Sequence, residues 1–239
     1  MKKSVSLILV LALCLSLCAC VGGNSKKAFD DSQSAFIHIT EAYLATNEFS
    51  QDVYEAWFQG VNNRTKFDSD SELSAFAKEM HIDEENIKQA VANLMGKESF
   101  EYGDWSKLPY RYNNTSYFSA WIDVISEAYE CSGKADAIRE ELLAAKELMK
   151  GLSEKYADYE HYPVLKEYFT NTLAFFDFCC NPEGSFEQVK DTFNSYRNTA
   201  REYFFDLNYV FGDSIGGMDE YINKNTTEAE PATEPAAIG

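Results

Sequence analysis

Apolar side chains recur every three or four positions through nearly all of residues 28–222, which is the period of an amphipathic α-helix. Alternation of apolar and polar residues, the pattern of a half-buried strand, is scarce. A helix with one apolar stripe must cover it with other helices, and short connections make sequential helices antiparallel. The sequence therefore predicts an all-α fold, an antiparallel helical bundle of about seven to eight helices.

The first part of this region predicts short helices paired as hairpins. One apolar stripe covers residues 29–44 and a second covers residues 53–58, so two separate helices are expected there. Ser69, with Glu72 three residues later, forms a capping box at the start of the next helix. Asp83 is expected to cap the helix after that.

The second part predicts a four-helix region of longer elements. Gly133 separates the first pair, and Pro163 lies in the first turn of the third helix, where its missing N–H costs no hydrogen bond. Ser185 and Gln188 form another capping box at the start of the fourth helix. The expected helices span residues 117–130, 134 to about 159, 164–180 and 186–211.

The beginning of the chain has the three parts of an export signal. Two lysines are followed by an apolar run over residues 5–17, which is too short to span a bilayer comfortably, and a small residue precedes Cys20. Leu17, Ala19 and Cys20 resemble the lipobox of bacterial lipoproteins, in which an aliphatic residue, a small residue and an invariant cysteine occupy these positions. The resemblance covers residues 1–20 and does not extend into the rest of the chain.

The resemblance implies that residues 1–19 are removed and that the thiol of Cys20 receives a diacylglyceryl group. Two or more acyl chains hold a protein lastingly at a membrane, whereas a single chain binds only marginally. The expected location is therefore the extracytoplasmic face of the cell membrane, with the lipid as anchor. Cys18 is a poorer acceptor because Leu17 before it is too large for the small position. A plain secretory signal is the alternative.

Beyond the signal peptide, the chain divides into three parts. Residues 20–27 are short, polar and contain glycine, which suits a flexible lipidated tether. Residues 28–222 are expected to form one all-α extracytoplasmic domain, whose core can draw on 17 Phe, 15 Tyr and 3 Trp. Residues 223–239 carry prolines, threonines and acidic residues but no aromatic residue, so this tail is expected to be disordered.

The net charge opposes one class of partner. The formal charge is −18, and loss of the leader removes Lys2 and Lys3 and no acidic residue, which makes it −20. Such a field repels nucleic acid and anionic lipid headgroups. The expected partners are the membrane, through the lipid on Cys20, and an envelope protein, a peptide or a glycan, with no nucleic acid.

Few residues carry the usual metal-binding or redox chemistry. The cysteines that follow Cys20 are Cys131, Cys179 and Cys180. One disulfide from Cys131 to either of the other two is permitted, but buried free thiols are favoured. His38 and Glu41 have the reverse of the Glu-x-x-His order of di-iron bundles, and no matching pair recurs. The sequence therefore assigns no metal site and no cofactor.

The longest stretch without helical periodicity, residues 100–117, is the best candidate for a binding surface. It concentrates Tyr, Trp and Arg, the residue types that dominate binding hot spots, and long loops inside compact domains are often functional. Packing of this loop against the bundle is the alternative interpretation. The candidate binding residues are Tyr102, Trp105, Tyr110, Arg111 and Tyr112.

The chain lacks the nucleophile elbow, the phosphate-binding loop and the dinucleotide fingerprint. The sequence thus favours a lipid-anchored helical domain that acts in recognition or scaffolding at the bacterial cell envelope over an enzyme. The alternative is an envelope hydrolase that acts on peptidoglycan or glycan, with Glu98 as its acid. A solute-binding lipoprotein is disfavoured because such proteins are built from α/β lobes, and no βαβ alternation is present.

Overall fold

The fold is all-α, as the sequence predicts. The computed structural model describes the backbone of residues 2–62, 69–107 and 118–212, and the side chains of residues 25–58, 69–104, 107 and 120–212. Within these ranges there are seven α-helices, one 3₁₀ helix and no strand. The elements are α1 Lys2–Asn62, α2 Asp70–Glu79, α3 Glu84–Leu94, η1 Tyr102–Lys107, α4 Phe118–Cys131, α5 Lys134–Lys155, α6 Tyr162–Cys180 and α7 Phe186–Phe211.

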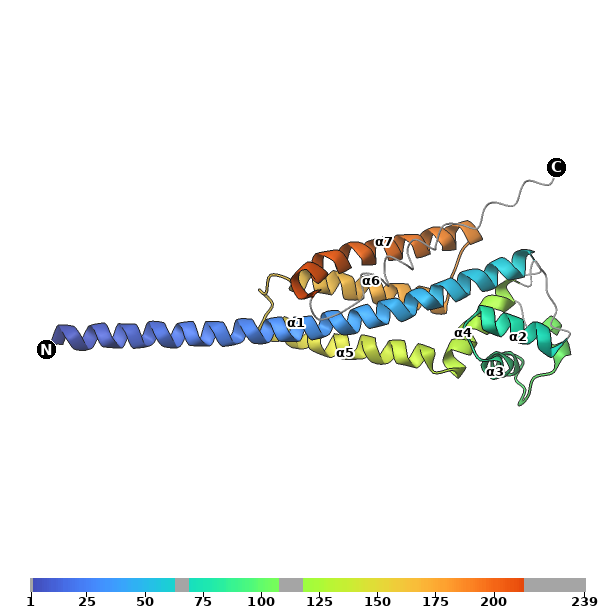
Figure 1. Ribbon diagram of the computed structural model, residues 1–239, viewed down its shortest axis with the longest axis horizontal. Coiled ribbons are helices and arrows are strands. Elements are labelled where there is room, and N and C mark those ends of the chain that lie inside the picture. Colours follow the sequence, from blue (N-terminus) through green and yellow to red (C-terminus); the bar gives the residue numbers. More distant parts are fainter. Residues whose placement is uncertain (1, 63–68, 108–117, 213–239) are drawn as a thin grey trace.

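The long helix α1 is the centre of the bundle. It packs against α4, α5, α6 and α7, and its N-terminal part extends beyond them (Figure 1). Helices α5 and α7 run opposite to α1 and α6, so these four helices form an antiparallel bundle (Figure 1). Helices α2 and α3 pack on each other, and α3 packs on α4, at the end of the bundle where α1 finishes (Figure 1).

The structure corrects the prediction of two helices between residues 29 and 58. Helix α1 is continuous there, and the segment contains neither Gly nor Pro, the two residues that disfavour a helix most. The polar residues that interrupt its apolar stripe are buried instead of forming a loop, and they are Thr46, Asn47, Ser50 and Asp52. The four-helix bundle therefore consists of α1, α5, α6 and α7. The sequence predicted that the helix at residues 117–130, which is α4, would take the place that α1 occupies.

Several predicted helix starts are confirmed. The hydroxyl of Ser69 accepts a hydrogen bond from the N–H of Glu72 at the start of α2. At the start of α7, the hydroxyl of Ser185 accepts from the N–H of Gln188 over 3.3 Å, and the Gln188 side chain accepts from the N–H of Ser185 over 2.8 Å. Asp83 is the N-cap of α3, although its side chain makes no capping hydrogen bond. Local signals therefore place the starts of these helices.

Aromatic side chains fill the core between α1 and its neighbours. Phe36 is fully buried, and its ring centroid lies 5.6 Å from that of Phe204 and 5.7 Å from that of Phe211 on α7. Phe49 stacks on Tyr129 of α4 with a centroid distance of 3.9 Å. The largest fully buried side chains are Trp121, Tyr43, Tyr129, Tyr168, Phe36, Phe49, Phe175, Phe193, Phe204, Phe211 and Ile39. This core fixes the register of α1 against the later helices.

Candidate functional site

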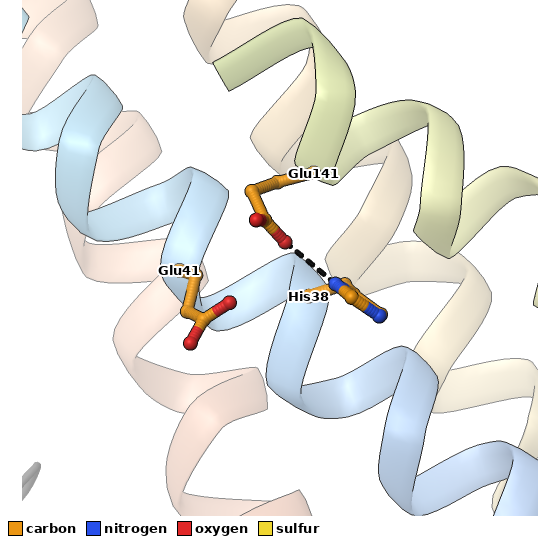
Figure 2. Close-up of side chains that lie close together, drawn as sticks. All are labelled: His38, Glu41 and Glu141. Carbon is orange, nitrogen blue, oxygen red and sulfur yellow. Dashed lines mark hydrogen bonds and ion pairs between the residues drawn. The ribbon is translucent and has the colours of Figure 1, made fainter. Parts of the chain in front are cut away.

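Three titratable side chains from α1 and α5 meet at the surface of the bundle. Nδ1 of His38 donates a hydrogen bond to Oε2 of Glu141 over 2.6 Å, and Glu41 lies beside this pair (Figure 2). One side-chain nitrogen or oxygen from each of the three residues lies within 4.8 Å of the others. The side chains of His38 and Glu141 are each 34% exposed, so solvent reaches the group. We call these three residues the histidine–carboxylate cluster.

Helix geometry brings the cluster together. His38 and Glu41 are three residues apart on α1 and therefore share one face. Glu141 comes three residues after the buried Ile138 and four before the buried Ala145, so it lies beside the apolar stripe of α5, the helix that packs on α1. The sequence pattern predicts no metal site at His38 and Glu41, because their order is the reverse of the di-iron motif, and it does not single out Glu141. A charged residue in register with a buried apolar stripe is the signal that could have found it.

The carboxylates of the cluster are close enough to repel each other. Partial desolvation is the main cause that raises the pKa of Glu41, and the charge and hydrogen bonding of Glu141 raise it further, whereas the charge of His38 lowers it. The overall charge of −18 adds a field that favours cations. With one imidazole nitrogen and two carboxylates, the cluster can hold a shared proton or a cation.

A second polar group is buried inside the bundle. Asp52 of α1 is 3% exposed and accepts a hydrogen bond from the hydroxyl of Tyr129 over 2.7 Å. Nδ1 of the exposed His81 lies 3.6 Å from Oδ1 of Asp52. Lys134 donates to Glu48 over 2.7 Å and to the carbonyl of His81 over 3.0 Å. Burial raises the pKa of Asp52 to about 6, although the Tyr129 hydrogen bond and the Lys134 charge lower it.

The buried polar residues of α1 also bind α7. Nε of Arg197 donates to Oδ1 of Asn47 over 2.8 Å, and Nη2 donates to the hydroxyl of Ser50 over 2.6 Å. Burial lowers the pKa of Arg197, because the charged form loses water. Since a buried polar group is costly without a hydrogen-bond partner, these bonds explain how Asn47 and Ser50 lie inside the bundle, whereas the buried hydroxyl of Thr46 has no partner in the described part of the chain.

The structure describes the beginning of the predicted binding loop. The Tyr102 ring packs against Phe100, and its hydroxyl donates to Asp70 at the start of α2. Asp104, which is fully buried, accepts a hydrogen bond from Lys97 over 2.5 Å. That bond is the main cause that lowers the pKa of Asp104. Tyr102 thus ties η1 to α2, and Asp104 ties it to the turn that follows α3.

The remaining candidate residues of the loop cannot be placed in the same way. Trp105 belongs to η1, but its side chain lies outside the described residues. Tyr110, Arg111 and Tyr112 also lie outside the described residues.

Glu98, the acid of the alternative hydrolase interpretation, is exposed in the turn between α3 and η1. The general acid of a lysozyme-type enzyme lies instead in apolar surroundings.

The three cysteines after Cys20 are free thiols, as the sequence favours, but Cys131 and Cys180 are partly exposed, whereas the sequence predicts burial. Cys179 is buried and donates a weak hydrogen bond to the carbonyl of Thr46 over 3.9 Å. Burial raises the pKa of Cys179 and raises that of Cys180 to about 11, which makes both thiols poor nucleophiles. His161, at the N-cap of α6, is about 27 Å from Cys179 along that helix and cannot activate it.

Helix α1 includes the predicted lipidation site. Its backbone is helical through residues 20–27, for which the sequence predicts a flexible tether. The side chain of Cys20 lies outside the described residues, as does the predicted tail at residues 223–239. Among the residues searched, which are those that the structure describes, no helix has the length and apolar character needed to cross a membrane.

The architecture defines the protein as an all-α helical bundle. Comparison with known proteins gave no match to a protein-family model, a curated protein or a solved structure. The functional argument therefore depends on the residues of this chain alone.

Proposed function

We propose that this protein is a lipid-anchored, extracytoplasmic helical domain that acts in recognition or scaffolding at the bacterial cell envelope. The observation that carries the proposal is the lipobox of Leu17, Ala19 and Cys20 after a cationic start and a short apolar run. Diacylation at Cys20 followed by N-terminal processing gives a stable anchor without a membrane-spanning segment.

The proposed anchor lies close to the folded body. Among the side chains of α1 that the structure describes, which begin at residue 25, Ala28 is the first buried one, and it follows Cys20 by eight positions. Eight residues span about 12 Å as a helix and at most about 28 Å when extended. The bundle is therefore held near the outer surface of the membrane, where a lateral partner in the envelope is within reach.

Cys20→Ala is expected to abolish membrane attachment, because the acylated sulfur is the anchor. The measurement is incorporation of a labelled fatty acid, together with separation of membrane and soluble fractions, in cells that produce the full chain. Cys18→Ala is the matched control and should retain both label and membrane attachment. Label that persists in Cys20→Ala, or that is lost in Cys18→Ala, would contradict the proposed site.

An exposed stripe on α7 supports recognition as the role of the anchored body. Arg201, Phe205 and Tyr209 follow each other at four-residue spacing and are exposed, Tyr209 to 94%. The guanidinium carbon of Arg201 lies 5.4 Å from the ring centroid of Phe205. Arg and Tyr are among the residue types most enriched in binding hot spots, and exposed aromatic side chains are common in interfaces.

The double variant Phe205→Ala, Tyr209→Ala is expected to reduce capture of an envelope partner about ten-fold or more, because hot-spot truncations cost roughly 2 kcal/mol. The measurement is quantitative mass spectrometry of proteins cross-linked to the full chain in intact cells. Leu143→Ala, which removes a 58% exposed side chain from α5, is the control. If all variants captured the same proteins at the same yield, the stripe would be excluded as a binding surface. In a separate zymogram, clearing of cell-wall material by the wild type would favour the hydrolase alternative.

A further inference from the structure

We propose that the histidine–carboxylate cluster, formed by His38, Glu41 and Glu141, binds one divalent transition-metal ion of the Zn²⁺ class. The inference goes beyond the anchoring and recognition proposed above and does not depend on them. It rests on three donor groups from two packed helices that meet at one solvent-accessible point (Figure 2).

The distances within the cluster fit a metal ion of this size. With metal–ligand bonds of about 2.1 Å, two ligands of a tetrahedral ion lie about 3.4 Å apart. The contact between His38 and Glu141 is 2.6 Å, and the donor atoms of all three residues lie within 4.8 Å of one another. The separation of about 3.4 Å that two metal ligands require lies between the contact distance of 2.6 Å and the limit of 4.8 Å. Side-chain rotations of the two glutamates can therefore open the direct contact and admit the ion without moving either helix.

The donor types select the class of metal. An imidazole nitrogen suits Zn²⁺ and its neighbours in the first transition row, whereas Ca²⁺ and Mg²⁺ are bound almost entirely by oxygen. The two glutamates supply negative charge to neutralise the ion, and His38 supplies the nitrogen that distinguishes this site from an ordinary acidic surface. Three protein ligands leave a coordination position for water or for a group from a bound partner.

The direct hydrogen bond between His38 and Glu141 is the competing explanation, in which the two residues only fasten α1 to α5. In that explanation Glu41 contributes only a hydrogen bond to Glu141, which requires a proton shared between the two carboxyl groups, although its carboxylate lies within reach of both other donors. A metal ion uses all three residues and links α1 to α5 through one centre. Binding should then stabilise the folded chain in proportion to the metal concentration.

The test is titration of the metal-free full chain in detergent with ZnCl₂, followed by isothermal calorimetry and by thermal unfolding. The cluster variants are His38→Gln, whose amide retains a donor for Glu141, and Glu41→Gln, which changes an exposed side chain. His161→Gln removes a half-buried histidine elsewhere and is the matched control. MgCl₂ and CaCl₂ titrations test selectivity, and far-UV circular dichroism verifies that each variant is folded.

The wild type and His161→Gln are expected to bind one Zn²⁺ saturably and to unfold at a higher temperature with Zn²⁺ present. Loss of a metal-site group typically weakens affinity by about ten-fold or more, so His38→Gln and Glu41→Gln should lose at least that factor together with the shift in unfolding temperature. Unchanged Zn²⁺ affinity in His38→Gln, several weak sites in place of one, equal binding of Mg²⁺, or no saturable Zn²⁺ binding by the wild type would each overturn the proposal.

Discussion

Gln51→Pro is expected to lower the free energy of unfolding by about 3 kcal/mol or more, which is the cost of proline inside a helix. Gln51 lies in the interior of α1, and its side chain is exposed, so the substitution acts on the backbone alone. Proline removes the N–H that bonds the preceding turn, and its ring clashes with the carbonyl four residues earlier. The measurement is urea unfolding followed by circular dichroism.

Gln51→Ala is the control for this substitution and should change the free energy of unfolding by less than about 0.5 kcal/mol. The comparison tests whether α1 is one helix, because the sequence pattern alone predicts a break near this position. If Gln51→Pro were as stable as Gln51→Ala, a loop would exist between the two apolar stripes and the continuous α1 would be wrong.

Asp52→Asn is expected to stabilise the protein at pH 7 by up to about 3 kcal/mol, with little effect at pH 4. Burial raises the pKa of Asp52 from an ordinary 3.8 to about 6, so the folded state holds this proton more tightly than the unfolded chain. The stabilisation from the protonated form is complete below pH 3.8 and is lost as the pH rises through about 6. Asparagine stays neutral and can still accept from the Tyr129 hydroxyl.

The quantity to measure for Asp52→Asn is the difference in unfolding free energy between variant and wild type from pH 4 to pH 7.5. Other acidic residues titrate in both proteins and cancel in this difference. Asp191→Asn, which changes an exposed aspartate on α7, is the control and should give a flat, small difference. If the difference for Asp52→Asn did not grow as the pH rises from 4 to 6, the raised pKa of Asp52 in the folded state would be wrong.

Local signals in the sequence predict much of the second half of the bundle. Helix α7 begins and ends at the predicted residues, and its start is set locally because the side chains of Ser185 and Gln188 accept hydrogen bonds from each other's backbone N–H groups. Gly133, with φ of +74°, separates α4 from α5 as predicted, since glycine adopts this conformation without steric cost. Caps and turns are set by neighbouring residues, so a single sequence is enough to find them.

The continuity of α1 and the candidate metal site depend on residues far along the chain. Asp52 can lie inside the bundle because the hydroxyl of Tyr129, 77 positions later, donates a hydrogen bond to it. Ser50 can lie there because the guanidinium of Arg197, 147 positions later, donates a hydrogen bond to its hydroxyl. Glu141 meets His38 across 103 positions. Such pairings arise only when the helices pack, so a polar interruption in an apolar stripe looks like a loop until the packing is known.

The central place of α1 has a consequence for how the protein folds. Phe211, the last residue of α7, accepts a hydrogen bond at its carbonyl from Gln33, 178 positions earlier, and its ring packs on Phe36. Helix α1 therefore completes its packing only when α7, which is synthesised much later, has folded against it. Contacts of such long sequence separation slow folding, and the part of the apolar stripe of α1 that α7 covers remains exposed until α7 has been synthesised. A chain truncated before α7 should thus be prone to aggregation, and a chaperone that shields the nascent helix should raise the yield of native protein.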